Sequence, residues 1–470
     1  RMFLATGDAK YVDVYERAMY NGVISGVSLS GDLFFYDNPL ESMGQHERQP
    51  WFGCACCPGN VTRFMASVPG YIYAVRGDDI YVNMYARGRA TIETDNNRID
   101  VVQTTRYPWD GGVTMAVTPE KPGRFAVKFR IPGWTRNNPV GTDLYTYTDG
   151  AKSVTISVNG KKFRGRQKDG YVTIERNWTA GDLVELNLPM EVRRVRAHDN
   201  VKADAGKLAI ERGPVVYCLE GCDQPDGMVF NKYIPEDTEF EAIYDKDFLN
   251  GVIRLVGIAG QVDKEGSVTE DTCTAIPYST WCNRGAGQMI VWLPTSADGA
   301  YPSPESTIAS RARALEPDEK ENGWPGFNSA ALYQSAGTDL PGIPVWGVND
   351  QWEPASSSDI GKPYYCWFGN RGQDESVAYL FDTVETVSET EVYWLDFDHY
   401  DVNYRVPQSW ELFYLTGEGR WQPVDNEGDY TAEKDRYNVV KFKPVTTAGL
   451  KITARPQQGA SGGIIEWKVK

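Results

Sequence analysis

The chain has 470 residues and a formal net charge of −16, with acidic and basic residues mixed rather than gathered in blocks. Nucleic acids and anionic membranes require a basic surface, so the composition excludes both as partners. No apolar run approaches the ~18 residues of a membrane-spanning helix, and the length suits about three domains.

Residues 1–72 are predicted to be the helical part. Residues 1–5 are expected to be the last turn of a helix that Gly7 ends, and Asp8 to cap the next one. Asn21-Gly22 is expected to stop that second helix. A stripe of residues at helical spacing predicts its buried face: Tyr11, Val14, Tyr15 and Ala18, flanked by Val12 and Met19.

Three of the eight cysteines fall within four residues, in the segment Gly53-Cys54-Ala55-Cys56-Cys57-Pro58-Gly59-Asn60-Val61-Thr62-Arg63. Proline is favoured in the first turn of a helix, and Asn60 to Val68 is predicted to be helical. Cys56 and Cys57 would then lie at a helix N-terminus, which lowers the pKa of a thiol. The alternatives are buried apolar cysteines or a zinc site, which needs four ligands where this cluster offers at most three.

Two further polar residues are candidates for substrate binding. His46 lies with Arg48 in a polar loop before the cysteines, where a solvated loop histidine is the alternative. Arg63 follows the cysteine pair at a helical position. It would hold a sugar hydroxyl or carboxylate, or else an internal carboxylate of the protein.

From Tyr71 onward the hydrophobic period changes to two, which predicts strands. We expect a β-sandwich at 73–200, a second β-sandwich unit at 201–285, and a strand near 286–294 that returns to the first sandwich. Asn159-Gly160 is a strong hairpin signal, and residues 137–148 are expected to be an inserted loop. The other cysteines are expected to be buried free thiols, with Cys218–Cys222 and Cys273–Cys282 bridges as the alternative.

Residues 295–325 are rich in Gly, Ser, Pro and charge, and predict a linker with a short helix near 308–315. The remainder, 326–470, resembles the discoidin-like (factor V/VIII type C) jelly roll, through segments such as Pro407-Gln408-Ser409-Trp410-Glu411-Leu412-Phe413-Tyr414. Such domains bind sugar, bind structural calcium or only pack. Five aromatic residues are candidate sugar platforms on loops: Trp352, Tyr364, Tyr365, Trp367 and Tyr400.

The cysteine segment, with Trp51-Phe52 before it, resembles the signature of glycoside hydrolase family 127 and its sister family 146. Four further segments match the same families: Thr6-Gly7-Asp8-Ala9-Lys10-Tyr11, Glu16-Arg17-Ala18-Met19-Tyr20-Asn21-Gly22, Phe35-Tyr36-Asp37-Asn38-Pro39-Leu40 and Trp281-Cys282-Asn283-Arg284-Gly285. The resemblance covers roughly residues 1–296. It implies that residues 1–72 are the C-terminal tail of an (α/α)6 barrel, so the fold class is mainly β and multidomain.

The resemblance also implies a site. In that family three cysteines and one glutamate hold zinc, and one of the cysteines is the nucleophile. Cys56 would be nucleophile and ligand, Cys57 a second ligand, and Tyr36 a substrate contact. The remaining ligands and the acid/base glutamate precede the first residue of this chain, so the zinc site here is incomplete.

The function expected is retaining hydrolysis of β-L-arabinofuranosides or related plant-glycan sugars. The alternative is a carbohydrate-binding or structural zinc protein without catalysis. We expect the chain to be the C-terminal piece of a longer periplasmic or secreted bacterial protein, whose signal peptide would lie in the missing N-terminal portion. Alone, we expect it to be catalytically silent.

Overall fold

The computed structural model describes residues 1–44, 46–52, 56–263, 265–301, 307–315, 345–360, 363–367, 374–399 and 402–470. It is mainly β, as the sequence predicts. None of the helices it describes is long and apolar enough to cross a lipid bilayer. The chain forms two compact units. The first comprises Arg1–Ser42, Arg48–Trp51 and Ala55–Pro302, and the second Met43–Glu47, Phe52–Cys54 and Ser303–Lys470.

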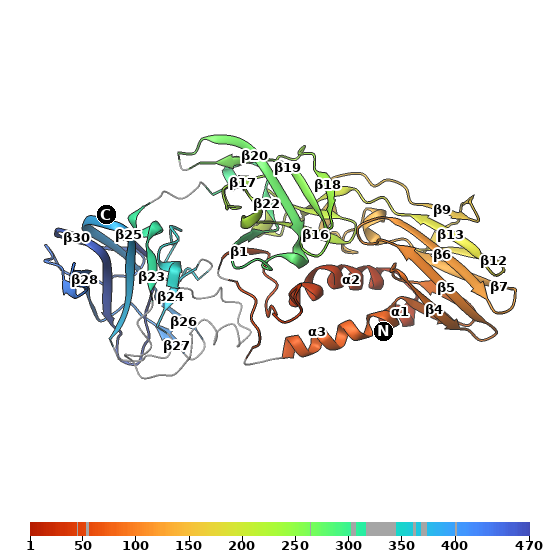
Figure 1. Cartoon of the computed structure of the whole chain (residues 1–470), viewed down its shortest axis with the longest axis horizontal. Coiled ribbons are helices and arrows are strands. Elements are labelled where there is room, and N and C mark those ends of the chain that lie inside the picture. Colours follow the sequence, from red (N-terminus) through yellow and green to blue (C-terminus); the bar gives the residue numbers. More distant parts are fainter. Residues whose placement is uncertain are drawn as a thin grey trace. The chain divides into compact units, whose positions relative to one another are not determined.

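The first unit begins with helices α1 (Met2–Thr6) and α2 (Lys10–Ala18) (Figure 1). Gly7 ends α1 with φ of 74°, and its N–H donates to the Phe3 carbonyl at 2.7 Å. Glycine adopts this left-handed conformation at no steric cost, so the predicted helix end is confirmed. The Asp8 carboxylate accepts from the Lys10 N–H at 3.0 Å, but the N-cap residue of α2 is Ala9, one position later than predicted.

The prediction that Asn21-Gly22 stops α2 is wrong. The chain continues as a π-helical turn, Met19–Val23, and a 3-10 turn, Ile24–Gly26. Asn21 is buried, and its amide group donates to the Pro214 carbonyl at 2.9 Å and accepts from the Val216 N–H at 2.8 Å. These bonds to a distant strand satisfy the amide and hold the turn, which local sequence alone does not predict.

The buried face of α2 also differs from the predicted stripe. Val12, Glu16 and Met19 are buried, whereas Val14 is 56% exposed. Glu16 is buried because it pairs with a cation of the neighbouring sandwich. A charged residue therefore takes the place that the hydrophobic pattern assigned to apolar ones.

A β-sandwich follows the helices, built from two sheets. One has six strands in the order β10-β9-β13-β6-β5-β4, and the other has five in the order β11-β12-β7-β3-β2. The bounds are Tyr73–Arg76 (β2), Asp79–Val82 (β3), Gly88–Glu93 (β4), Arg98–Thr105 (β5), Gly112–Pro119 (β6), Gly123–Arg130 (β7), Thr155–Val158 (β9), Lys161–Phe163 (β10), Gln167–Lys168 (β11), Tyr171–Trp178 (β12) and Asp182–Asn187 (β13). Asn159 and Gly160, with φ of 50° and 72°, form the predicted hairpin between β9 and β10.

The second β-rich part of this unit is an eleven-stranded sheet in the order β17-β19-β20-β16-β15-β14-β8, with β1, β18, β21 and β22 paired alongside. The bounds are Glu41–Met43 (β1), Tyr145–Tyr147 (β8), Val192–Ala197 (β14), Lys207–Arg212 (β15), Val215–Glu220 (β16), Lys232–Tyr233 (β17), Glu241–Asp245 (β18), Val252–Val262 (β19), Val268–Pro277 (β20), Gln288–Ile290 (β21) and Leu293–Pro294 (β22).

This sheet changes three expectations. The strand expected to return to the first sandwich joins the large sheet instead, where β21 pairs with β16 and β22 with β15. β14 belongs to the same sheet, although the sequence assigned its residues to the sandwich. The predicted loop at 137–148 contains β8, which pairs with β14. Short buried strands do not reveal their partners, because pairing is fixed by distant residues.

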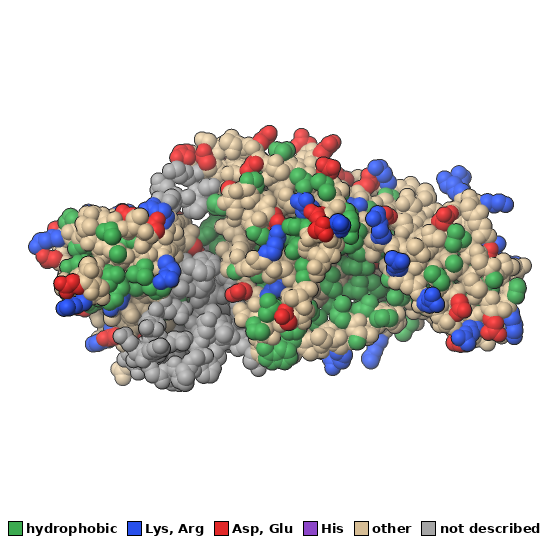
Figure 2. Space-filling view, viewed as in Figure 1, with side chains coloured by type: hydrophobic (Ala, Val, Ile, Leu, Met, Phe, Trp, Pro, Cys, Tyr) green, Lys and Arg blue, Asp and Glu red, His purple; other side chains and the backbone are tan. Residues whose placement is uncertain are grey.

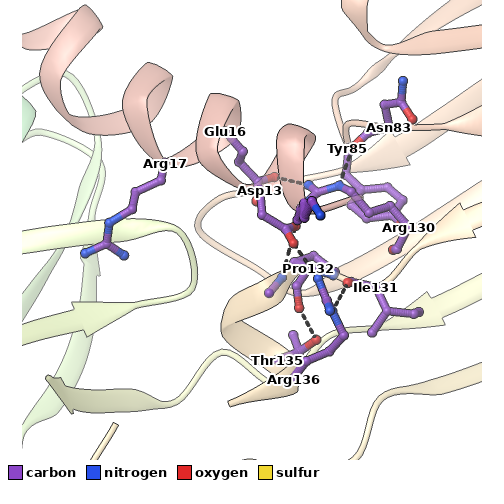
Figure 3. A network of polar contacts seen from close by, with 12 residues as sticks. Asp13, Glu16, Arg17, Asn83, Tyr85, Arg130, Ile131, Pro132, Thr135 and Arg136 are labelled. Atoms are coloured by element: carbon purple, nitrogen blue, oxygen red, sulfur yellow. Dashed lines mark hydrogen bonds and ion pairs between the residues drawn. The ribbon is translucent and has the colours of Figure 1, made fainter. Parts of the chain in front are cut away.

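Arg130, at the end of β7, joins the helices to the sandwich (Figure 3). Its side chain is fully buried and forms ion pairs with Asp13 and Glu16 of α2, while its Nε donates to the Asn83 carbonyl at 2.5 Å. Tyr107 donates to Glu16 at 2.8 Å, so the buried carboxylate has a second donor. Burial opposes the charged form of Arg130, but the two carboxylates raise its pKa well above the usual value and keep it charged.

The second unit contains a sheet in the order β24-β31-β25-β30-β28-β29, with β23 paired to β25 (Figure 1, blue). The bounds are Ile308–Arg311 (α4), Arg313–Leu315 (β23), Tyr365–Cys366 (β24), Glu375–Trp394 (β25), Phe397–His399 (β26), Val402–Tyr404 (β27), Ser409–Leu415 (β28), Trp421–Pro423 (β29), Tyr437–Arg455 (β30) and Gly463–Val469 (β31). β26 and β27 form a separate pair. The discoidin-like jelly roll stays a prediction.

The predicted linker at 295–325 contains structural elements. The expected short helix is present as α4, and β23 pairs with β25. Ala309 and Ala312 are buried in the core of the second unit, and buried Asn349 donates to both of their carbonyls. These residues belong to the second unit because their backbone and side chains complete its core.

Replacing Arg130 by methionine should lower the free energy of unfolding of the first unit by about 3–5 kcal/mol, because two carboxylates would lose their buried cation. The measurement is urea denaturation. Arg124→Met is the matched control, since Arg124 lies on the same strand and pairs with Glu175 at 3.0 Å on the surface. That exposed pair should contribute about 1 kcal/mol or less. Equal effects of the two changes would contradict a central role of Arg130.

The boundary of the second unit gives another test. A chain of residues 303–470 should unfold cooperatively and at a higher temperature than one of residues 326–470. The shorter chain lacks α4 and β23. The core then loses Ala309 and Ala312, and the part of β25 that pairs with β23 loses its partner strand. Circular dichroism melting of both chains checks this. Equal melting temperatures would mean that α4 and β23 contribute nothing to the fold.

Candidate functional site

The cysteine pair lies in the first turn of α3 (Cys56–Ser67). The helix starts four residues earlier than predicted, so Cys56 and Cys57 are its first two residues and Pro58 its third. A proline there costs no hydrogen bond, because the first N–H groups of a helix have no intrahelical partner. The two Sγ atoms are 3.8 Å apart, much farther than in a disulfide. Cys54 lies outside the described residues.

Tyr36 is brought to this pair from a segment twenty residues earlier. Its hydroxyl lies 3.7 Å from the Cys56 Sγ. The neighbouring Phe35 is buried and stacks on Trp281, with ring centroids 4.8 Å apart. The structure therefore places two of the predicted site residues, Tyr36 and Cys56, in contact.

Arg48 holds this arrangement, a role that sequence reasoning missed. It is buried and donates to three backbone carbonyls: those of Ser25 at 2.7 Å, Trp281 at 3.0 Å and Cys282 at 3.2 Å. Its guanidinium also lies over the Phe35 ring, 4.2 Å from the centroid. Burial lowers the pKa of Arg48 to about 10, so it remains charged at neutral pH. In the sequence, the only sign of this role was the position of Arg48 just before the cysteine segment.

Arg63 lies on the same face of α3 as Cys56, since residues four and seven apart fall on one side of a helix. Its guanidinium donates to the Asn60 side chain, and Asn60 in turn donates to the Cys56 carbonyl at 2.9 Å. Arg63 is exposed. The hydrogen-bond partner of Arg63 is thus the amide of Asn60. One of the two expectations had been an internal carboxylate.

His46 is half-buried rather than a freely solvated loop residue. Burial lowers its pKa to about 4, so the imidazole is uncharged at neutral pH. Its predicted role in substrate binding stays a prediction.

The other cysteines are free thiols in the described part of the chain, as expected, but Cys222 is exposed rather than buried. Cys218, Cys273 and Cys282 are buried, and neither alternative disulfide is present. Glu220, Cys222 and Asp223 lie close enough together to suit a metal ion. Arg284 forms ion pairs with both carboxylates, and its positive charge opposes a cation there.

Three family models match the first unit in succession. They describe the catalytic domain of a GH127 β-L-arabinofuranosidase (residues 1–70), its middle domain (79–190), and a glycoside hydrolase family 127 C-terminal domain (192–294). The boundary near 190 coincides with the change from the sandwich to the large sheet. The chain belongs to glycoside hydrolase family 127.

Individual relatives agree with this membership. A non-reducing end β-L-arabinofuranosidase of Bifidobacterium longum subsp. longum is 34% identical over 317 residues, 60% of this chain and 45% of its own. A solved GH127 β-arabinofuranosidase has a TM-score of 0.62 and 44% identity, over 65% of this chain and 48% of its own.

A GH127 β-L-arabinofuranosidase of Geobacillus stearothermophilus T6 has a TM-score of 0.57 and 40% identity, over 63% of this chain and 47% of its own. The family 127 chain described here therefore spans about half the length of the relatives it matches.

Proposed function

We propose that this chain carries the nucleophile half of a retaining glycosidase that acts on β-L-arabinofuranosides or related plant-glycan sugars. The observation that carries the proposal is the Cys56–Cys57 pair in the first turn of α3, with the Tyr36 hydroxyl 3.7 Å from Cys56. This geometry lies within the segment matched by the GH127 catalytic-domain model, and the matched relatives are named as arabinofuranosidases.

The cysteine pair fits a zinc ion. Two sulfurs bound to tetrahedral zinc at ~2.3 Å each would be separated by about 3.8 Å. The observed separation of the Cys56 and Cys57 sulfurs is 3.8 Å. Both residues would hold the ion, together with a cysteine and a glutamate from outside this chain. When bound, zinc keeps the coordinating thiols deprotonated at neutral pH.

In the proposed reaction the Cys56 thiolate attacks the anomeric carbon, and the bond from that carbon to the leaving oxygen breaks. A carboxylic acid outside this chain donates a proton to the leaving oxygen. Its carboxylate then takes a proton from water, which displaces the sulfur and releases the sugar with its configuration retained. The Tyr36 hydroxyl, fixed through Phe35 and Arg48, orients the sulfur or a sugar oxygen beside it.

We propose that the partner completing the site is the preceding portion of the same protein. The helices expose several apolar side chains: Met2, Leu4, Val14 and Met65. A cavity of about 410 Å³ opens beside α1 and α2, lined among others by Phe3, Tyr15 and Tyr71. Apolar surfaces of this kind are normally covered by other protein surface. A periplasmic or secreted location suits a substrate that lies outside the cell.

Replacing Cys56 by serine in the complete polypeptide should abolish hydrolysis of an aryl β-L-arabinofuranoside yet leave most of the zinc bound. Serine removes the nucleophilic thiolate while Cys57 and the outside ligands remain. Steady-state kinetics and metal analysis measure the two effects. Cys222→Ser is the control, since that cysteine is exposed and distant in sequence, and it should retain activity. Activity like that of the unaltered enzyme in the Cys56 variant would refute the assignment.

The alternative function is a carbohydrate-binding protein in which the cysteines only hold a structural metal. Alkylation followed by mass spectrometry distinguishes the two. A nucleophilic Cys56 should be labelled selectively and protected by substrate. Apart from the half-buried Cys57 of the pair, the other cysteines that the structure describes are buried, except Cys222, whose pKa is raised to about 12 by partial burial and by Glu220. A thiol of this pKa reacts slowly, so the background should be low.

For the second unit, we propose a structural calcium ion held by Glu466 and Asp350. Glu466 is fully buried on β31, and its Oε2 lacks a hydrogen-bond donor among the described residues. Burial and the neighbouring Asp350 raise its pKa well above the usual range. Carboxylate oxygens are the ligands that Ca²⁺ prefers, and Asp350 is a close neighbour of Glu466.

Removing calcium with EGTA should lower the melting temperature of the second unit by roughly 4 °C, as loss of a ligand that binds only the folded state does. Glu466→Gln should eliminate this dependence, whereas Glu411→Gln, an exposed residue of β28, should preserve it. Differential scanning calorimetry provides the measurement. If the melting temperature does not change when calcium is removed, the proposed calcium ion is not bound.

Sugar binding by the second unit also stays a proposal, but its candidate platforms change. Tyr364, Tyr365 and Trp367 were expected on loops and are 1%, 4% and 3% exposed. They pack in the core and present no face to a sugar. Trp352 is half-exposed, and Tyr400 lies outside the described residues.

A further inference from the structure

A cavity of about 590 Å³ lies along the open edge of the sandwich, lined by residues of β10, which ends one sheet, and β11, which ends the other. This volume falls within the range of small-molecule sites. Six of its lining residues matter here: Arg136, Lys152, Lys162, Phe163, Arg164 and Gln167. We call this cavity the edge groove.

The edge groove is cationic in an acidic protein. Four of its lining residues are Lys or Arg and none is Asp or Glu. Lys162, Phe163, Arg164, Gly165 and Gln167 of the lining belong to a basic run of the sequence, Lys161-Lys162-Phe163-Arg164-Gly165-Arg166-Gln167-Lys168. Lys and Arg side chains also project from the end of the molecule that carries β9 (Figure 2).

Two of the four cations are already neutralised. Arg136 pairs with Asp13, and Lys152 pairs with Glu191. Within the part of the chain that the structure describes, Lys162 and Arg164 have no ion-pair partner. The groove therefore presents two uncompensated positive charges, both exposed to an incoming ligand.

The other lining groups suit a sugar. Thr135, Ser153, Thr155 and Gln167 supply hydroxyl and amide groups. The half-exposed ring of Phe163 lies against Gly165, where an added Cβ would stand 2.6 Å from a ring carbon. Glycine thus allows the ring to approach the backbone closely, and its exposed part provides apolar contact area.

We propose that the edge groove binds the carboxylate-bearing sugars of an acidic oligosaccharide, with Lys162 and Arg164 facing the carboxylates. The choice of a glycan rests on the proposed function. It also follows from the mixture of cations, hydroxyls and one aromatic ring. A nucleic acid strand would need a longer basic track, and the net charge of −16 repels a long polyanion.

The competing explanation is protection of sheet edges, since edge strands commonly carry lysines that prevent pairing with other chains. Protection requires only that the charges be present on the edge. It does not require them to line a concave space without acidic residues. Lys161 and Arg166 separate the two explanations, because they belong to the same basic run but do not line the groove.

The test is isothermal titration of the full chain with a galacturonic acid hexamer, and with the same hexamer fully methyl-esterified. We expect binding of the charged hexamer only, weakened as salt rises. K162Q/R164Q should reduce the affinity by about tenfold or more, as expected for lost charge-assisted hydrogen bonds. The control K161Q/R166Q should change it by less than about twofold, since exposed charges that do not line the groove make no direct contact with the ligand and contribute little.

Several results would overturn the proposal. These are no binding of the charged hexamer, equal loss in both double variants, or tighter binding of a single-stranded oligonucleotide at the same residues. All four residues are exposed, and unchanged melting curves would show that the variants remain folded. Cys56→Ser should bind the hexamer as the unaltered chain does. This result separates the edge groove from the proposed catalytic site, so either can fail without the other.

Discussion

The buried guanidinium of Arg130 is the interaction on which the first unit depends. It reaches from the end of β7 into α2 and neutralises two carboxylates one helical turn apart, Asp13 and Glu16. Tyr107 donates a further hydrogen bond to Glu16, and the Asn83 carbonyl accepts from the Nε of Arg130. A buried ion pair is costly unless its members are fully hydrogen-bonded, and here each has several partners. The network therefore fixes the position of the helices against the sandwich.

This attachment extends toward the large sheet. Arg17, the next residue of α2, pairs with buried Glu211 of β15, which also accepts from Tyr147 at 2.6 Å. One short helix is thus tied by charges to both β-rich parts of the first unit. The turns that follow α2 are held by the neutral amide of Asn21, through hydrogen bonds to the backbone of Pro214 and Val216. The segment that leads to Phe35 and Tyr36 therefore begins at turns whose position is fixed by these contacts.

The candidate site is also held in place by a buried arginine. Arg48 satisfies three carbonyls and supports the Phe35 ring, and Tyr36 thereby meets the first turn of α3. Arg130 and Arg48 therefore act alike. Both are buried arginines that fix backbone segments, and the precision of the site derives from them. The edge groove differs because its cations are exposed and its two free charges remain available to a ligand.

The local features of the chain were determined by sequence alone. Gly7, the Asn159-Gly160 hairpin and the cysteine pair at a helix N-terminus follow from backbone preferences of single residues, which act over a few positions. The cysteine segment also identified the family, because its residue types are specific.

Tertiary structure decided the rest. It buried Glu16 and Arg48, which composition would place at the surface, and it buried Tyr364, Tyr365 and Trp367, which were expected on loops. It also placed β14, β21 and β22 in the large sheet. Glu16 and Arg48 depend on partners more than a hundred residues away. β21 and β22 pair with strands that lie 69 to 87 residues earlier in the chain. A charged side chain becomes a core residue only when such a partner is present, and no local pattern records that partner.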